Sequence, residues 1–173
     1  MSAFTSRMGL RRVVAGLLTV GWLLGWAWQA QAQDSKEIDD LMRQAQTELQ
    51  KGQPRDAEKT LRRAIEMAPT RGELYMLRSR ARDSSGKFDA ALEDANKYIE
   101  LEPNDPYAYI NRSRIHVSME KPELALADAN RAIQLDPQEP DGYYRRSDIY
   151  RQMGRKAESE ADENKAEQLA GAQ

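Results

Sequence analysis

Apolar and polar residues recur along most of this chain with the spacing of amphipathic helices. One stretch shows the pattern clearly, because its apolar side chains follow one another at steps of three and four residues: Phe88, Ala91, Leu92, Ala95, Tyr98 and Ile99. That spacing places them on a single helix face. Similar stripes, separated by short segments with glycine or proline, continue from residue 38 to the C-terminus. The pattern predicts an all-α fold built from helix-turn-helix pairs.

The helical pattern repeats every 34 residues. Residues 127–137 are a near copy of residues 93–103, and four columns recur at the same step: Ala57, Ala91 and Ala125; Ile65, Ile99 and Ile133; Pro69, Pro103 and Pro137; Tyr75, Tyr109 and Tyr143. A fixed period of this size indicates a repeat architecture, in which neighbouring helix pairs stack to bury one continuous core. We predict four repeats, at residues 38–71, 72–105, 106–139 and 140–173.

Two repeats depart from this pattern. The turn of the third repeat has Glu120 where the other turns have Gly52, Gly86 and Gly154, so we expect a slightly altered corner there. The last helix, from Lys156 onward, is more polar than its counterparts. Since a terminal repeat has no following neighbour, we expect this helix to cap the stack.

The first 32 residues have a different character. Arg7, Arg11 and Arg12 precede an apolar run that ends in small residues at Ala30-Gln31-Ala32. This pattern is typical of a secretory signal peptide over residues 1–32, followed by a polar lead-in at residues 33–37. The alternative is an uncleaved membrane anchor, because the apolar run approaches the about 20 residues of a membrane span. We expect an exported, periplasmic protein, or one anchored in the inner membrane and facing the periplasm.

Composition removes several classes of function. The chain has no cysteine and one histidine, His116, so thiolate chemistry is absent and a histidine metal site would need a second histidine. Residues 1–32 hold three of the 26 basic residues and none of the 28 acidic ones, leaving a net charge of about −5 in the remainder. A chain this acidic is a poor ligand for nucleic acid. No nucleophile-and-base pair, glycine-rich phosphate loop or metal-ligand spacing is present, so we expect neither enzyme activity nor a cofactor or metal.

The repeat columns resemble the tetratricopeptide repeat across residues 38–173. In the second repeat an aromatic residue, Tyr75, is followed by a small one, a turn glycine, an alanine five residues later, and a proline that closes the unit. Leu41 in the first repeat and Ser159 in the fourth depart from the family pattern. The resemblance implies a right-handed α-solenoid whose first helices line a concave groove. It also implies that the protein binds other proteins or peptides without catalysis.

This resemblance assigns a peptide-binding groove to the first helices. The candidate residues are Met76, Arg80, Ile110, Asn111, Arg114, Tyr144 and Arg145. Adaptable apolar side chains beside a basic patch suit a protein or peptide partner with an acidic or carboxylate feature. Alternatively, the arginines are solvated surface. The carboxylate clamp of some family members is matched only at Asn111 and Arg145, so a true clamp is not expected.

Two further columns pair an arginine with an aspartate. Their members are Arg78, Arg112 and Arg146 on the first helices and Asp94, Asp128 and Asp162 on the second helices. One interpretation is a positive ladder for an acidic ligand. The other, which we favour, is a structural pair within each repeat, because a half-buried arginine needs a carboxylate at its fork.

These observations favour a non-catalytic interaction module, serving as an adaptor or assembly factor in an exported compartment. A membrane-tethered scaffold with an uncleaved N-terminal anchor is the alternative, and only in that case would the membrane be a partner. An enzyme is the class with the least support.

Overall fold

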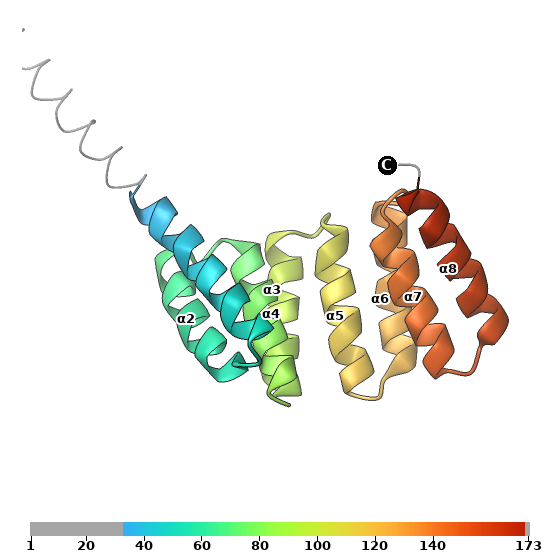
Figure 1. Cartoon of the computed structure of the whole chain (residues 1–173), viewed down its shortest axis with the longest axis horizontal. Coiled ribbons are helices and arrows are strands. Elements are labelled where there is room, and N and C mark those ends of the chain that lie inside the picture. Colours follow the sequence, from blue (N-terminus) through green and yellow to red (C-terminus); the bar gives the residue numbers. More distant parts are fainter. Residues whose placement is uncertain (1–32, 172–173) are drawn as a thin grey trace, which may run out of the picture. The chain divides into compact units, whose positions relative to one another are not determined.

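The computed structural model describes residues 33–171, and within this range the chain is helical with short turns (Figure 1). Residues 33–50 are helical and are followed by α2 (Pro54–Met67), α3 (Gly72–Ser84), α4 (Phe88–Leu101), α5 (Pro106–Ser118), α6 (Pro122–Leu135), α7 (Pro140–Gln152) and α8 (Lys156–Ala170). No strand occurs among these residues, which confirms the predicted all-α class.

The chain divides into two compact units, residues 1–40 and residues 41–173, and the second contains the repeats from α2 onward. The expected signal peptide at residues 1–32 lies outside the described residues. Residues 33–37, expected as a polar lead-in, are helical instead. Their polar sequence is compatible with a helix because lysine and glutamate are good helix formers on an exposed surface.

The helices form antiparallel pairs that follow one another along the chain. The second helices begin at residues 54, 88, 122 and 156, which keeps the 34-residue step of the sequence. Contacts join α3 to α4, α5 to α6 and α7 to α8 within pairs, and α2 to α3, α4 to α5 and α6 to α7 between pairs. The described residues therefore form eight helices in the paired arrangement that the sequence predicts.

The core lies between the second helix of one repeat and the first helix of the next. Ile115 on α5 is fully buried against Ala91 and Ala95 of α4. Ile149 on α7 takes the same place against Ala125 and Ala129 of α6. Alanines on one helix leave room for a branched side chain from the next, so each repeat completes the core of its neighbour.

The tyrosine and proline columns meet in a hydrogen bond. The Tyr75 hydroxyl donates to the carbonyl oxygen of Pro69 at 2.9 Å, and Tyr109 and Tyr143 donate to Pro103 and Pro137 at 3.1 and 3.3 Å. Each bond ties the loop that enters a repeat to the first helix of that repeat. These two columns therefore recur together because one supplies the donor and the other the acceptor.

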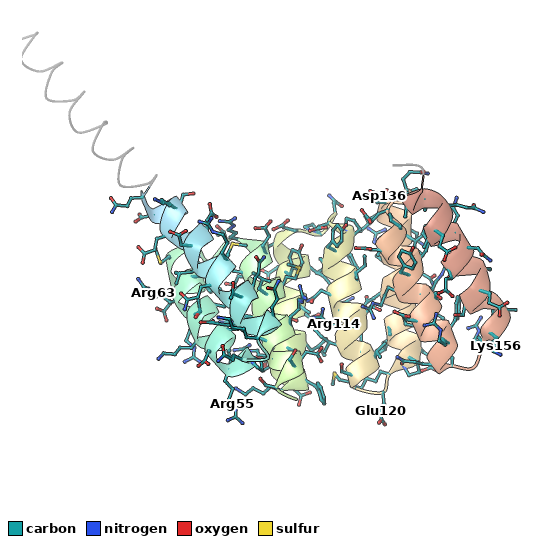
Figure 2. All side chains as sticks on the ribbon, in the orientation of Figure 1. Arg55, Arg63, Arg114, Glu120, Asp136 and Lys156 are labelled. Atoms are coloured by element: carbon teal, nitrogen blue, oxygen red, sulfur yellow. The ribbon has the colours of Figure 1, made fainter. Side chains whose placement is uncertain are left out.

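The corner at Glu120 is the same as the glycine corners, so the expectation of an altered turn is wrong. Glu120, labelled in Figure 2, lies in the turn before α6. It adopts φ 56°, close to the 71–74° of Gly52, Gly86 and Gly154. The closing bond from Lys121 N–H to the His116 carbonyl oxygen is 2.9 Å, equal to the bond from Lys87 to Arg82 at the previous corner. The helix pair thus holds a glutamate in the left-handed region.

Replacing Glu120 by glycine should therefore stabilise the protein. A side chain in the left-handed region costs roughly 1–2 kcal/mol, and the extra freedom of glycine in the unfolded chain offsets part of that gain. We expect Glu120→Gly to raise the free energy of unfolding by about 0.5–1 kcal/mol in urea titrations. The reciprocal control, Gly86→Ala, should lower it, and equal stability of all three proteins would contradict this expectation.

Candidate functional site

The first helices of the repeats lie side by side, whereas the second helices do not. Contacts join α3 to α5 and α5 to α7, but none joins α4 to α6 or α6 to α8. In a curved stack of helix pairs, the helices on the inner side lie closer to one another than those on the outer side. These contacts therefore indicate that the first helices lie on the inner side. We use the name inner surface for the residues of α3, α5 and α7 that the sequence analysis assigns to the groove and that are at least partly exposed, together with Tyr107: Met76, Arg80, Tyr107, Ile110, Arg114, Tyr144 and Arg145.

Apolar and aromatic side chains form one part of the inner surface. Tyr144 is 38% exposed, and Met76 and Ile110 are partly exposed. Tyr107, which the sequence analysis did not select, is 41% exposed and lies one turn before Ile110 on α5. Burial and a hydrogen bond to Glu139 raise the pKa of Tyr107 to about 12, so its hydroxyl stays protonated. Large exposed aromatic side chains favour contact with another protein.

Arg114 lies at the centre of the basic part, on α5 (Figure 2). Its Nε donates to Asp83 Oδ2 of α3 at 3.3 Å, and its Nη2 donates to Asn111 Oδ1 at 2.9 Å. Burial lowers the pKa of Arg114 to about 10; the Asp83 carboxylate opposes this shift, and the charges of Arg80 and Arg145 add to it. Arg114 is therefore a fixed, largely enclosed charge between two other cations.

Arg80 and Arg145 differ from Arg114 because neither is paired with a carboxylate among residues 33–171. Arg80 is exposed on α3 and lines a hollow of 390 Å³ with Leu49 and Leu77. Arg145 is half-buried on α7, and its Nε is enclosed without a hydrogen-bond acceptor. Two guanidinium groups on this surface thus lack an internal partner, and they are the groups free to meet a ligand.

Asn111 does not line the inner surface as the sequence analysis expected. It is only 3% exposed, its amide donates to Ser79 Oγ at 3.1 Å, and its carbonyl oxygen accepts from Arg114. Both polar groups of the amide are consumed between α3 and α5. Asn111 therefore positions Arg114 and presents nothing to a partner.

The arginine and aspartate columns form a bidentate pair in the second, third and fourth repeats. Arg78 donates to Asp94 at 2.9 and 2.7 Å, Arg112 to Asp128 at 2.9 and 2.7 Å, and Arg146 to Asp162 at 2.7 Å through both nitrogens. Arg112 and Arg146 also donate to Asn96 and Asn130 of the preceding repeat, at 3.0 and 2.7 Å. These arginines link helices within and between repeats, and their charges are already neutralised.

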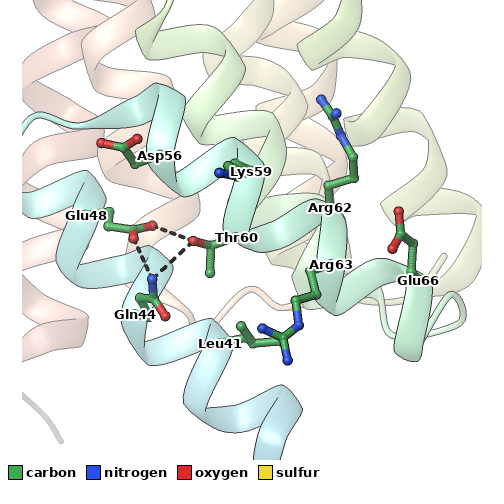
Figure 3. A pocket seen from close by; sticks show the side chains of 9 residues that line it. All are labelled: Leu41, Gln44, Glu48, Asp56, Lys59, Thr60, Arg62, Arg63 and Glu66. Carbon is green, nitrogen blue, oxygen red and sulfur yellow. Dashed lines mark hydrogen bonds between the residues drawn. The ribbon is translucent and has the colours of Figure 1, made fainter.

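The first repeat replaces that pair with neutral residues. Gln44 and Thr60 occupy the arginine and aspartate columns, and the Gln44 amide lies 3.4 Å from Thr60 Oγ1. Glu48 accepts hydrogen bonds from both of them (Figure 3). A hollow of 510 Å³ surrounds these shorter side chains, with Asp56, Lys59, Arg62, Arg63 and Glu66 on its walls. Its mixed charges favour no single class of ligand.

His116 is buried beside Asp128, with 3.6 Å between Nε2 and Oδ2. Its Nδ1 has no hydrogen-bond partner. Burial lowers the pKa of His116, and the charges of Arg112 and Lys121 lower it too, whereas Asp128 opposes them. The folded protein therefore favours the neutral imidazole.

Lowering the pH should reduce the stability of the folded protein through His116 before most carboxylates bind a proton. With its pKa depressed in the folded state, His116 binds a proton first in the unfolded chain. Its contribution to stability is present above a pH of about 6.5 and is lost as the pH falls through the folded pKa. We expect the urea midpoint to fall between pH 7.5 and 5.5 in the wild type and to fall less in His116→Gln. An equal fall of the urea midpoint in the two proteins would show that His116 does not cause this pH dependence.

Two features of the described residues bear on other functions. No helix between residues 33 and 171 combines the length and apolar character needed to cross a membrane. No group of three or more potential metal-ligating side chains is found in the same range.

The paired helices define the class of the protein, an all-α repeat protein. The family model of the tetratricopeptide repeat matches residues 42–107 and 110–173, so the chain belongs to the tetratricopeptide-repeat family. Its members are generally non-catalytic protein-interaction scaffolds. The comparison with curated protein sequences yields no match.

Solved structures share the fold at low sequence identity. A crystal structure of MamA is 21% identical, with a TM-score of 0.64 over 78% of this chain and 79% of that one. A thermophilic TPR protein of Thermus thermophilus is 20% identical, with a TM-score of 0.71 over 76% and 74%. An O-GlcNAc transferase mutant of Thermobaculum terrenum is 18% identical, with a TM-score of 0.62 over 68% of this chain and 22% of that one.

Proposed function

We propose that this protein is a non-catalytic adaptor or assembly factor that binds a protein or peptide partner on its inner surface. The observation that carries the proposal is the contrast between two sets of arginines. Arg78, Arg112 and Arg146 are neutralised by aspartates inside the repeats, whereas Arg80 and Arg145 have no such partner among residues 33–171. The first helices α5 and α7 also carry the exposed rings of Tyr107 and Tyr144. A cationic and aromatic surface suits a partner with an acidic or carboxylate feature.

The proposed compartment is the periplasm of a Gram-negative bacterium. Support comes from the sequence of residues 1–32, in which arginines, an apolar run and a small-residue site follow in the order of an export signal. The tethered form, anchored in the inner membrane and facing the periplasm, is the alternative. Sequencing the N-terminus of the mature protein separates the two, because cleavage after Ala32 leaves Gln33 as the first residue.

A capture experiment tests the binding function without using the arginines. The chain from Gln33 onward is immobilised, exposed to an envelope extract of the source cells, and the retained proteins are identified by mass spectrometry. The double variant Ile110→Asp with Tyr144→Ala should lose a retained protein because it removes apolar contact area from the inner surface. Leu124→Asp, which changes a 51% exposed residue on the second helix α6, should retain it. Loss in the control and not in the double variant would reject the inner surface.

A further inference from the structure

Two pairs of exposed charges, opposite in sign, occupy the same positions in the first two repeats. Arg55 and Lys59 lie one turn apart on α2, and Asp89 and Glu93 lie 34 residues later, one turn apart on α4. This spacing places each pair on a single face of its helix. All four residues are exposed, and Arg55 points away from the helices (Figure 2). Within residues 33–171, no side-chain hydrogen bond or ion pair engages them.

The later repeats do not continue this pattern. The corresponding positions hold Glu123 and Ala127 on α6, and Ala157 and Ala161 on α8. A pair of cations on one helix and a pair of acids at the equivalent positions of the next therefore distinguish the first two repeats from the rest of the stack.

The other exposed charges of these two helices do not cancel the contrast. On α4, the carboxylate of Glu100 is already engaged by Lys97 at 2.8 Å, so Asp89 and Glu93 are its exposed acids without a partner. On α2, exposed cations outnumber exposed acids by four to two: Arg55, Lys59, Arg62 and Arg63 against Asp56 and Glu66. The outer face of α2 is cationic, and the outer face of α4 is acidic.

The two pairs do not meet inside one molecule, because no contact joins α2 to α4. Both are second helices, which lie away from the inner surface. In a dimer with two-fold symmetry, a contact between α2 of one copy and α4 of the other is made twice, with the roles of the copies exchanged. The same four residues supply both contacts, so this surface is complementary to itself.

We propose that two copies of this chain associate through their second helices, with Arg55 and Lys59 of each copy opposite Asp89 and Glu93 of the other. Exposed ion pairs stabilise weakly and are screened by salt, so the dimer is weak and dissociates as the ionic strength rises. The inner surfaces of both copies stay open, because the contact uses second helices alone. The inference goes beyond the proposed function, since such a dimer offers two binding faces and gains avidity for a partner with two matching segments.

Sedimentation velocity of the purified protein tests the association at about 20 mM and about 500 mM salt. At low salt, the weight-average mass should rise with protein concentration toward twice the monomer mass. At high salt, the dissociation constant should increase about tenfold or more, because the screened charges no longer attract one another. This measurement needs no variant, so it does not depend on how a substitution affects folding.

Exchanging the charges identifies the residues. Arg55→Glu with Lys59→Glu makes both helices acidic, and Asp89→Lys with Glu93→Lys makes both cationic, so each double variant alone should stay monomeric at low salt. An equimolar mixture should associate again with about the affinity of the wild type, since each α2 then faces an α4 of opposite charge. Glu123→Lys, at the corresponding position of α6, should leave the association unchanged.

Thermal melts of all the variants should match the wild type, because the substituted side chains are exposed. A wild type that stays monomeric at low salt, an association that salt does not weaken, or a mixture that stays monomeric would each overturn the inference. Capture through Ile110 and Tyr144 does not use these charges. The proposed function would therefore survive any of these results, and the loss of capture in the Ile110 and Tyr144 variant remains its separate test.

Discussion

Ile115→Ala should lower the free energy of unfolding by about 3 kcal/mol, one of the largest losses expected of a single truncation in this chain. The side chain is fully buried against Ala91 and Ala95, which belong to the preceding repeat. The neighbouring alanine side chains are too small to fill the resulting cavity. The variant therefore loses the transfer free energy of the removed atoms and also bears the cost of the cavity. Urea unfolding followed by far-ultraviolet circular dichroism measures the loss.

Ile110→Ala is the matched control, since it makes the same chemical change on the same helix. Ile110 is partly exposed on α5, whereas Ile115 is fully buried. It should lose about 1 kcal/mol or less, in proportion to its smaller buried area. Equal losses for the two variants would show that the repeats do not depend on each other for their core.

Asp128→Ala should lower the free energy of unfolding by about 2–3 kcal/mol, because it leaves the half-buried Arg112 without its carboxylate. Breaking a buried pair costs roughly 3–5 kcal/mol, and the 27% exposure of the Arg112 side chain reduces that value through solvent screening. Asp128 also lies beside His116, so the variant removes a second neighbour of a buried polar group. Thermal and urea unfolding measure the effect.

Two companions separate pairing from a general effect of substitution. Glu123→Ala changes an exposed residue on the same helix and should stay within about 0.5 kcal/mol of the wild type. Asp128→Ala combined with Arg112→Met should recover part of the loss, because the unpaired charge is gone. An unchanged midpoint in Asp128→Ala would refute the structural role of the pair.

The helices and their pairing were predictable because they depend on columns that recur every 34 residues. Alanines mark where helices cross closely, and the tyrosine and proline columns hold the donor and acceptor of one hydrogen bond. The arginine and aspartate columns likewise lie opposite each other in every repeat where both occur. The right-handed sense of the stack and the repeat boundaries stay predictions from the family resemblance.

Contacts that occur once escaped the sequence analysis. The bond between Arg114 and Asp83 joins two repeats but has no counterpart column, so nothing in the period indicates it. Asn111 was selected for its position in the groove, yet Ser79 and Arg114 draw its amide into the interface. Glu120 was expected to change its corner, but the helices on either side impose the left-handed conformation regardless of the residue. These three features depend on which residues the packed helices bring together, and a single sequence does not show that.

Position-resolved photo-crosslinking in living cells tests most directly whether the inner surface is where a partner docks. A photoreactive amino acid is placed at Tyr107 or Tyr144 on the first helices, and in parallel at Glu93 or Leu124 on the second helices. We predict one shared crosslinked protein from the two inner positions, lost when Arg80 and Arg145 are both replaced by glutamine. Crosslinking from Glu93 and Leu124, with none from Tyr107 and Tyr144, would contradict docking on the inner surface.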